Sequence, residues 1–293
     1  MSFISSDDED WRWIDDYAQG KIKLGLDTGD KDLDEYFRYK KEFVIINGHS
    51  NVGKTTTALY LIANAAIRHD WKWIIYSSEN RTASVKKTLM EFAMDVKLQD
   101  MNYDERKQAY KWVDGIFVDP YNSLRLDMRN TSIGVHDYHY EAASEFLTFS
   151  NTHNVAVWLN MHAVTEAQRR KGADGLPVAP YAEDTEGGGK FVNRSDCFIT
   201  IHRKVQAPDH DIKNLSEIHI RTVRQVETGG QPTPIDCPHK FVMNLSHTGF
   251  MNWLTRKPLF TPKVFSPPKT GTFPNMSFLT KLEGEEKDTH HQA

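Results

Sequence analysis

The sequence has few cysteines and no long hydrophobic run. Its two cysteines, Cys197 and Cys237, are too few for a disulfide framework and lack the spacing of metal ligands. We expect two reduced thiols, as in cytosolic proteins. No apolar run approaches the length of a membrane-spanning helix. The acidic start of the chain, MSFISSDDED, also lacks the apolar centre of a secretory signal. The sequence therefore predicts a cytoplasmic protein without a membrane partner.

Positive charge is also scarce. The chain carries 36 Lys and Arg against 40 Asp and Glu, which gives a formal net charge of −4. A protein that coats nucleic acid through its bulk charge would be basic. Any contact with nucleic acid must therefore come from a local group of residues, such as a pair of loops or a lined pore.

Continuous apolar runs alternate with amphipathic segments in the first part of the chain. Such runs are typical of strands buried on both faces of a parallel sheet. Later strands follow one another without a long helix between them, which is typical of antiparallel pairing. The pattern predicts an α/β fold with a doubly wound, mainly parallel sheet and an antiparallel C-terminal extension. The predicted strands are 43–47, 73–78, 115–119, 155–160, 197–203, 217–224 and 240–246, with helices after 53, over 82–94 and near 139–152.

The two ends of the chain differ from its centre, and we divide it into 1–20, 21–255 and 256–293. The first segment is acidic, and Trp13, Ile14 and Tyr17 have the spacing of one helix face. A helix this short needs a surface to dock on. Periodicity alone favours the chain's own domain over a neighbouring subunit. The last segment holds five of the 12 prolines and ends in polar residues. We expect it to lie along the surface or to be disordered.

A phosphate-binding loop is the most specific motif. GHSNVGKT, residues 48–55, fits G-x-x-x-x-G-K-[ST] and lies between a predicted strand and a predicted helix. Glycines in such a loop let successive backbone N–H groups surround phosphate oxygens, and the helix N-terminus adds partial positive charge. We expect ATP and Mg²⁺ as cofactors, with Thr55 on the metal. The expected nucleotide-binding residues are Gly48, Asn51, Val52, Gly53, Lys54, Thr55 and Thr56.

Two acidic residues complete this predicted site. Asp119 ends the third predicted strand and could hold Mg²⁺ through water. Glu79 follows the second strand, and the carboxyl ends of parallel strands meet at the edge where ligands bind. Glu79 is therefore the candidate for the carboxylate that orients or deprotonates the attacking water. A turn-forming Asp and a solvated loop Glu are the alternatives.

The order of these motifs resembles the RecA-like ATPase domain of DnaB-type hexameric helicases. It is most similar to the phage primase-helicase and Twinkle branch, over residues 11 to 253. The resemblance is carried by WIDDYAQGKIKLGLDTGDKDLDEYF, GHSNVGKTT, SSEN, VDPYNSL, VWLNMH, YAEDTEGGGKFVNRSDCFITIHR and IHIRTVRQVETGG. Two departures are visible. Thr222 stands where the family usually has Lys, and no primase domain precedes the ATPase.

The resemblance implies roles for further residues. Glu79 would be the catalytic glutamate, His162 a sensor of the γ-phosphate, and Arg224 an arginine finger acting on a neighbouring subunit. It also implies that Trp13, Ile14 and Tyr17 dock on a neighbour.

Several basic and aromatic residues have weaker support. Arg203 and Phe250 could stack on the adenine, with ordinary packing as the alternative. In a ring motor, loops after the fourth strand face a central pore, so basic residues there could hold single-stranded DNA, unless they simply form a solvated face. These are Arg169, Arg170, Lys171 and Lys190, with Arg129 in a second loop.

The expected function is that of an ATP-driven hexameric helicase that translocates on single-stranded DNA during replication. A separate primase or polymerase would be a further partner, and a bacterial cytoplasm the location for a phage-encoded chain. Two alternatives remain open. One is a RecA/RadA-like recombinase filament, and the other is a regulatory P-loop ATPase that does not translocate.

Overall fold

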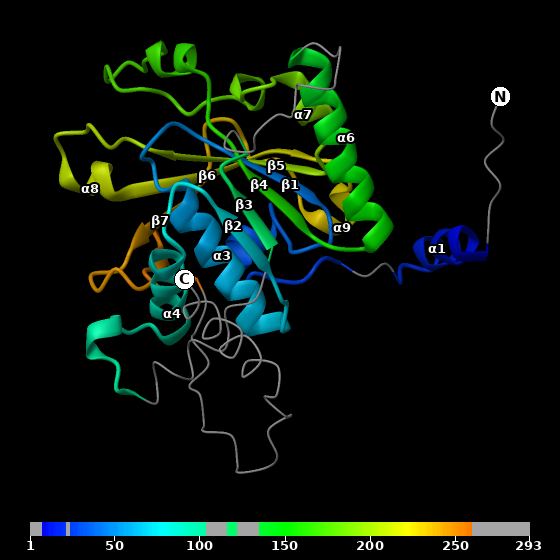
Figure 1. Ribbon diagram of the computed structural model, residues 1–293, viewed down its shortest axis with the longest axis horizontal. Helices are drawn as coiled ribbons and strands as arrows, with labels where there is room; N and C mark the ends of the chain where they lie inside the picture. The colour runs from blue at the N-terminus through cyan, green and yellow to red at the C-terminus, as the bar shows by residue number, and fades with distance from the viewer. Residues whose placement is uncertain (1–7, 22–23, 104–115, 122–134, 260–293) are drawn as a thin grey trace, which may run out of the picture. The chain divides into compact units, whose positions relative to one another are not determined.

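The computed structural model describes residues 8–21, 24–103, 116–121 and 135–259 (Figure 1). Eight strands in these ranges form one sheet, in the order β2-β3-β4-β1-β5-β6-β7-β8. The first five are parallel and the last three antiparallel, as the sequence predicts. The strands are β1 (Phe43–Asn47), β2 (Ile74–Ser77), β3 (Ile116–Asp119), β4 (Val157–Asn160), β5 (Cys197–Arg203), β6 (Leu215–Val223), β7 (His239–Met243) and β8 (Phe250–Asn252).

Helices cover both faces of the parallel part of the sheet (Figure 1). The longer ones are α3 (Lys54–His69), α4 (Thr82–Met94) and α6 (Val135–His153). The short ones are α2 (Lys31–Asp34), η1 (Leu98–Asp100), η4 (Thr165–Arg169), η5 (Ala182–Asp184), α7 (Gly189–Arg194), α8 (His210–Asn214) and α9 (Val226–Gly229), and α1 (Asp8–Ala18) begins the described chain.

The central strand β1 shows why the sheet is doubly wound. Val44 and Ile46 belong to one core cluster, which also contains residues of α3 and α4. Phe43 and Ile45 belong to a second cluster, which contains residues of α6 and α7. Because successive side chains of a strand point to opposite faces, an unbroken apolar strand needs a helical layer on each side. The continuous run FVIIN therefore places β1 in the middle of three layers.

Most predicted elements are confirmed, and the differences lie at their ends. Helix α4 has the predicted bounds, whereas α6 extends beyond the predicted 139–152 at both ends. Strand β8 was not predicted, because three residues are too few to show a period. The predicted loop 164–190 contains the two short helical turns η4 and η5, and α7 begins within it.

The two terminal segments have different outcomes. Helix α1 forms, and the rings of Trp13 and Tyr17 stack with centroids 5.6 Å apart. However, Trp13, Ile14 and Tyr17 are 59%, 48% and 49% exposed. The packing against the chain's own domain that periodicity favours is therefore not seen among the described residues. The predicted tail lies outside the described residues from 260 onward.

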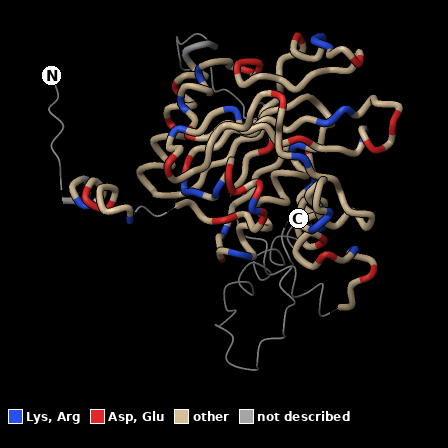
Figure 2. Tube along the Cα trace, turned by 180° about the vertical axis from the view of Figure 1, so that it is seen from behind, with Lys and Arg blue, Asp and Glu red and all other residues tan. Residues whose placement is uncertain are grey.

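Acidic and basic residues alternate over the described chain, without one continuous basic face in this view (Figure 2). This agrees with the negative formal charge and with the expectation that any contact with nucleic acid is local.

Candidate functional site

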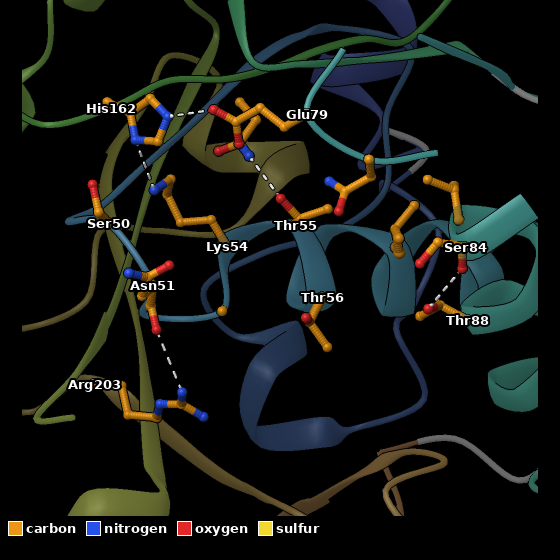
Figure 3. Close-up of a pocket in the computed structure, with 15 residues that line it drawn as sticks. Ser50, Asn51, Lys54, Thr55, Thr56, Glu79, Ser84, Thr88, His162 and Arg203 are labelled. Atoms are coloured by element: carbon orange, nitrogen blue, oxygen red, sulfur yellow. Dashed lines mark hydrogen bonds and ion pairs between the residues drawn. The ribbon is translucent and has the colours of Figure 1, made fainter. Parts of the chain in front are cut away.

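The phosphate-binding loop connects β1 to α3 at the carboxyl edge of the sheet (Figure 3). Gly48 lies so close to β5 that a Cβ there would be 2.4 Å from the carbonyl oxygen of Ile201. Gly53 caps α3 with φ of 93°, in the left-handed region that favours glycine. Both glycines of the motif are therefore required by the backbone. The loop places the N-terminus of α3, with its partial positive charge, at the bottom of the site.

Lys54 points into the site and is only 5% exposed. Its Nζ donates to the carbonyl oxygen of His49 at 2.9 Å and lies 3.4 Å from Nδ1 of His162. Burial lowers the pKa of Lys54 to about 8, although Asp119 and Glu79 act in the opposite direction. A buried ammonium group with so few anionic partners is suited to an incoming anion.

Asp119 ends β3 and is fully buried. Both of its carboxylate oxygens accept from Oγ1 of Thr55, at 3.0 and 3.1 Å. Nδ2 of Asn160 also donates to Asp119, and Nδ2 of Asn80 does so at 3.3 Å. This pairing of a carboxylate with the loop hydroxyl is suited to a magnesium ion, which takes few protein ligands and keeps several waters.

Sequence reasoning missed Asn80 and Asn160. Asn160 is the last residue of β4, and Asn80 directly follows Glu79. Both lie at the carboxyl ends of strands, which is the signal that could have found them. They were overlooked because an amide is not itself a catalytic acid or base.

Glu79 and His162 meet across the site. Nε2 of His162 lies 3.4 Å from Oε1 of Glu79, so that His162 stands between Glu79 and Lys54 (Figure 3). A cavity of about 510 Å³ opens beside these groups. The structure thus brings together the predicted catalytic, phosphate-binding and metal-binding residues of one chain. The cavity is lined by Ser50, Asn51, Gly53, Lys54, Thr55, Thr56, Leu59, Glu79, Asn80, Ser84, Val85, Thr88, Asn160, His162 and Arg203.

Three predicted nucleotide contacts have different positions. Arg203 lines the cavity, and its guanidinium donates to the carbonyl oxygen of Asn51 at 3.4 Å. Phe250 does not reach it. Its ring is 4% exposed and packs edge-on against Tyr60 and Phe241, at centroid distances of 5.0 and 4.6 Å. The proposed stacking of Phe250 on adenine is corrected to core packing. Val52 is also buried in the core, so only its backbone remains a candidate contact.

Arg224 lies at the opposite, amino edge of the sheet. It follows Val223, which pairs with Cys197 at the start of β5, whereas the phosphate-binding loop adjoins the end of that strand. The guanidinium forms an ion pair with Asp196 at 3.4 Å and donates to the carbonyl oxygen of Asn193 at 2.8 Å. The structure therefore does not bring Arg224 to the site of its own chain.

The predicted DNA-binding residues are spread over two segments. Arg169 and Lys171 are exposed around η4, whereas Arg170 is paired with Asp184 and lies 4.8 Å from the ring centroid of Tyr181. Lys190 is half-buried on α7 and has an interaction partner. Arg129 lies outside the described residues. Of this group, Arg169 and Lys171 present the most accessible cations.

Two solved structures share this architecture, although no protein-family model matches the sequence. One is the ATPase domain of a DnaB-like helicase, which matches with a TM-score of 0.67 and 16% identity. It covers 85% of this chain and 99% of that one. The other is a DnaB-like replicative helicase, solved in a study of its interactions with primase. It matches with a TM-score of 0.64 and 15% identity, and covers 85% of this chain and 67% of that one.

The chain has the RecA-like fold of a DnaB-like helicase ATPase domain. The predicted fold class is thereby confirmed. A sequence relative supports the same branch. The Twinkle homolog protein, chloroplastic/mitochondrial, of Arabidopsis thaliana is 24% identical over 252 residues. The match covers 71% of this chain and 34% of the relative, so the chain spans about a third of that protein's length. Among the described residues, no helix has the length and apolarity needed to cross a membrane.

Proposed function

We propose that this chain is the ATPase motor of a ring-forming DNA helicase, which translocates on single-stranded DNA and unwinds duplex DNA during replication. The division of one hydrolytic site between two edges of the sheet carries the proposal. The carboxyl edge holds Lys54, Glu79, Asp119 and His162, while Arg224 lies at the amino edge of the same sheet. A site of this kind is complete only when two copies meet.

ATP and Mg²⁺ fit the residues of the carboxyl edge. Bound Mg²⁺ would neutralise charge on the β- and γ-phosphates. Lys54 would turn from the His49 carbonyl to the phosphates, and Thr55 would turn its hydroxyl oxygen from Asp119 to the metal. Glu79 would orient the attacking water and accept its proton, and the 3.4 Å contact with His162 supports its place beside the γ-phosphate. Arg203 would lie alongside the nucleotide.

The proposed assembly is a six-membered ring. Arg224 of one copy would reach the phosphates of the next, and such a contact is heterologous, because it joins two different surfaces. The exposed apolar face of α1 supports the same assembly, since Trp13, Ile14 and Tyr17 have no described cover within their own chain. Docking on a neighbour would remove these side chains from water.

The proposed DNA contacts are local and face the pore of the ring. Arg169 and Lys171 would bind phosphates of the single strand, with Arg170 and Lys190 beside them. A separate primase or polymerase is a further proposed partner. The cytoplasmic location, in a bacterial host for a phage-encoded chain, stays a prediction.

The decisive experiment measures ATP hydrolysis with and without single-stranded DNA, for the wild type, Glu79→Gln and Glu141→Gln. The last variant makes the same change at an exposed residue of α6 and serves as the matched control. We expect DNA to stimulate the wild type and the control. Hydrolysis by Glu79→Gln should fall at least about 100-fold, because the general base is lost.

The alternatives give different outcomes. Hydrolysis that ignores DNA at low salt contradicts the motor and favours the regulatory ATPase. Stimulated hydrolysis by open filaments, seen by electron microscopy in place of closed rings, favours the recombinase.

A further inference from the structure

Residues 178–181 run across the phosphate-binding loop and are held there by their main-chain oxygens. The carbonyl oxygen of Val178 lies 3.1 Å from Nε2 of His49, and that of Tyr181 accepts from Nδ2 of Asn47 at 3.3 Å. The carbonyl oxygen of Pro180 accepts from Arg221 on β6 at 2.7 Å. We name these four residues the crossing segment. Two of its three anchors therefore belong to the end of β1 and the loop itself.

The crossing segment is continuous with the exposed cations of the preceding turn. The backbone N–H of Val178 donates to the carbonyl oxygen of Arg170 at 3.1 Å, and Lys171 pairs with Pro177. A shift of Val178 would therefore move Arg170 and Lys171 with it. Rigid hydrogen-bonded pieces of this kind can carry a change from one site to another.

His49 is connected to the phosphate site through its backbone and to the crossing segment through its ring. Its carbonyl oxygen accepts from Nζ of Lys54, and the side chain is almost completely buried, at 5% exposure. Because a carbonyl oxygen can only accept, Nε2 must carry the proton in the bond to Val178. An anion that draws Lys54 away removes the first of these bonds. His49 is then free to shift, together with the residue that its ring holds.

We propose that His49 is a positioning residue that couples occupancy of the phosphate site to the crossing segment and to the cations at 169–171. This link is separate from the one that His162 provides on the γ-phosphate side. It rests on the proposed function only in requiring that the loop binds a nucleotide. It requires neither hydrolysis nor DNA.

Hydrogen–deuterium exchange followed by mass spectrometry tests the link in the absence of DNA. Exchange over residues 166–182 is measured with and without saturating Mg²⁺ and a non-hydrolysable ATP analogue. In the wild type we expect the analogue to change the exchange rates of these amides by about threefold or more, which is the effect of altering one hydrogen bond. His49→Leu keeps the buried volume but has no donor, so the response should disappear. His49→Gln keeps a donor and should restore it.

Lys204→Ala is the matched control. Lys204 forms an ion pair with Asp174 in the same stretch of chain, but on the side away from the phosphate-binding loop. Its removal should raise exchange around Asp174 without abolishing the response to the analogue. Circular dichroism melts verify that each variant is folded, and His49→Ala is a second donor-free variant if the leucine does not fit.

Analogue binding, followed by fluorescence of a labelled nucleotide, separates the two hypotheses. A wild type that binds no nucleotide contradicts the proposed function. A wild type that binds the analogue without any change at 166–182 overturns the role of His49. An equal response in a folded donor-free variant overturns it as well.

Discussion

The two edges of the parallel sheet both bury charged side chains, but they use them differently. At the carboxyl edge, Lys54 and Glu79 border an open cavity and are joined only through the 3.4 Å contacts of His162. At the amino edge, Lys40 pairs with Glu42 at 3.3 Å, and Asp196 pairs with Arg224 at 3.4 Å. The first edge leaves charge available for a ligand, whereas the second neutralises its charges internally.

The pKa shifts show the same contrast. Burial lowers the pKa of Lys54 to about 8, and burial raises that of Glu42 to about 7. Both charged forms are disfavoured, but only Lys54 faces a space where a ligand could restore its charge. Arg224 is the exception at the amino edge, because its side chain remains 43% exposed. Burial of charge therefore indicates a ligand site only where the charge borders a cavity.

The largest test of this contrast moves activity from one edge to the other. If Arg224 completes the site of a neighbour, Arg224→Ala should lower DNA-stimulated hydrolysis by about 10³-fold, since a finger stabilises charge in the transition state. Binding of a labelled ATP analogue should change little. Arg194→Ala, which removes a cation at the end of α7, is the control. Mixing Arg224→Ala with Lys54→Ala chains should recover part of the activity, and loss of analogue binding would place Arg224 in its own chain's site.

A smaller effect is expected when the group holding Asp119 is removed. Asn160→Ala deletes the amide that donates to the buried carboxylate. Loss of such an outer contact weakens a metal site by about 10- to 100-fold. We expect the Mg²⁺ concentration for half-maximal hydrolysis to rise by that factor, measured at saturating ATP. An unchanged Mg²⁺ dependence with lowered activity would show that Asn160 acts elsewhere.

The pH dependence of nucleotide affinity tests the charge of Lys54. Phosphates would raise the pKa of Lys54 above its value of about 8 in the free chain. Affinity should therefore be full below this pH and fall by up to about tenfold per pH unit above it. Calorimetric titrations from about pH 7 to about pH 9.5 would measure the slope. Lys54→Arg stays charged across this range and should bind with a flat profile, if the longer side chain is accommodated.

The smallest effect concerns stability at the amino edge. Because the pKa of Glu42 is raised from 4.5 to about 7 in the folded chain, the free energy of unfolding should fall as pH rises between these values. Glu42→Gln removes this loss together with the contact to Lys40. We expect a net gain of about 1 kcal/mol at pH 8 and none at pH 4.5, by urea unfolding. A destabilised variant at pH 8 would mean that the ion pair outweighs burial.

The local motifs were predictable because each depends on residues close in sequence. Gly48, Gly53 and Lys54 lie within one strand–loop–helix unit, and the alternation of apolar runs predicted both helical layers. Glu79 and Asp119 were found because the carboxyl ends of parallel strands meet at one edge. Phe250 was misassigned, since nothing near it in sequence reveals the rings of Tyr60 and Phe241 that enclose it.

The sequence by itself determined the α/β fold, the phosphate-binding loop and the acidic groups beside it. It could do so because backbone conformation and hydrophobic period are properties of short segments. Only the tertiary structure decided that Asn80 and Asn160 hold Asp119, that His49 contacts Val178, and that Arg224 lies at the edge opposite to Lys54. These relations join residues that are distant in sequence, so they depend on how the strands are ordered and paired within the sheet.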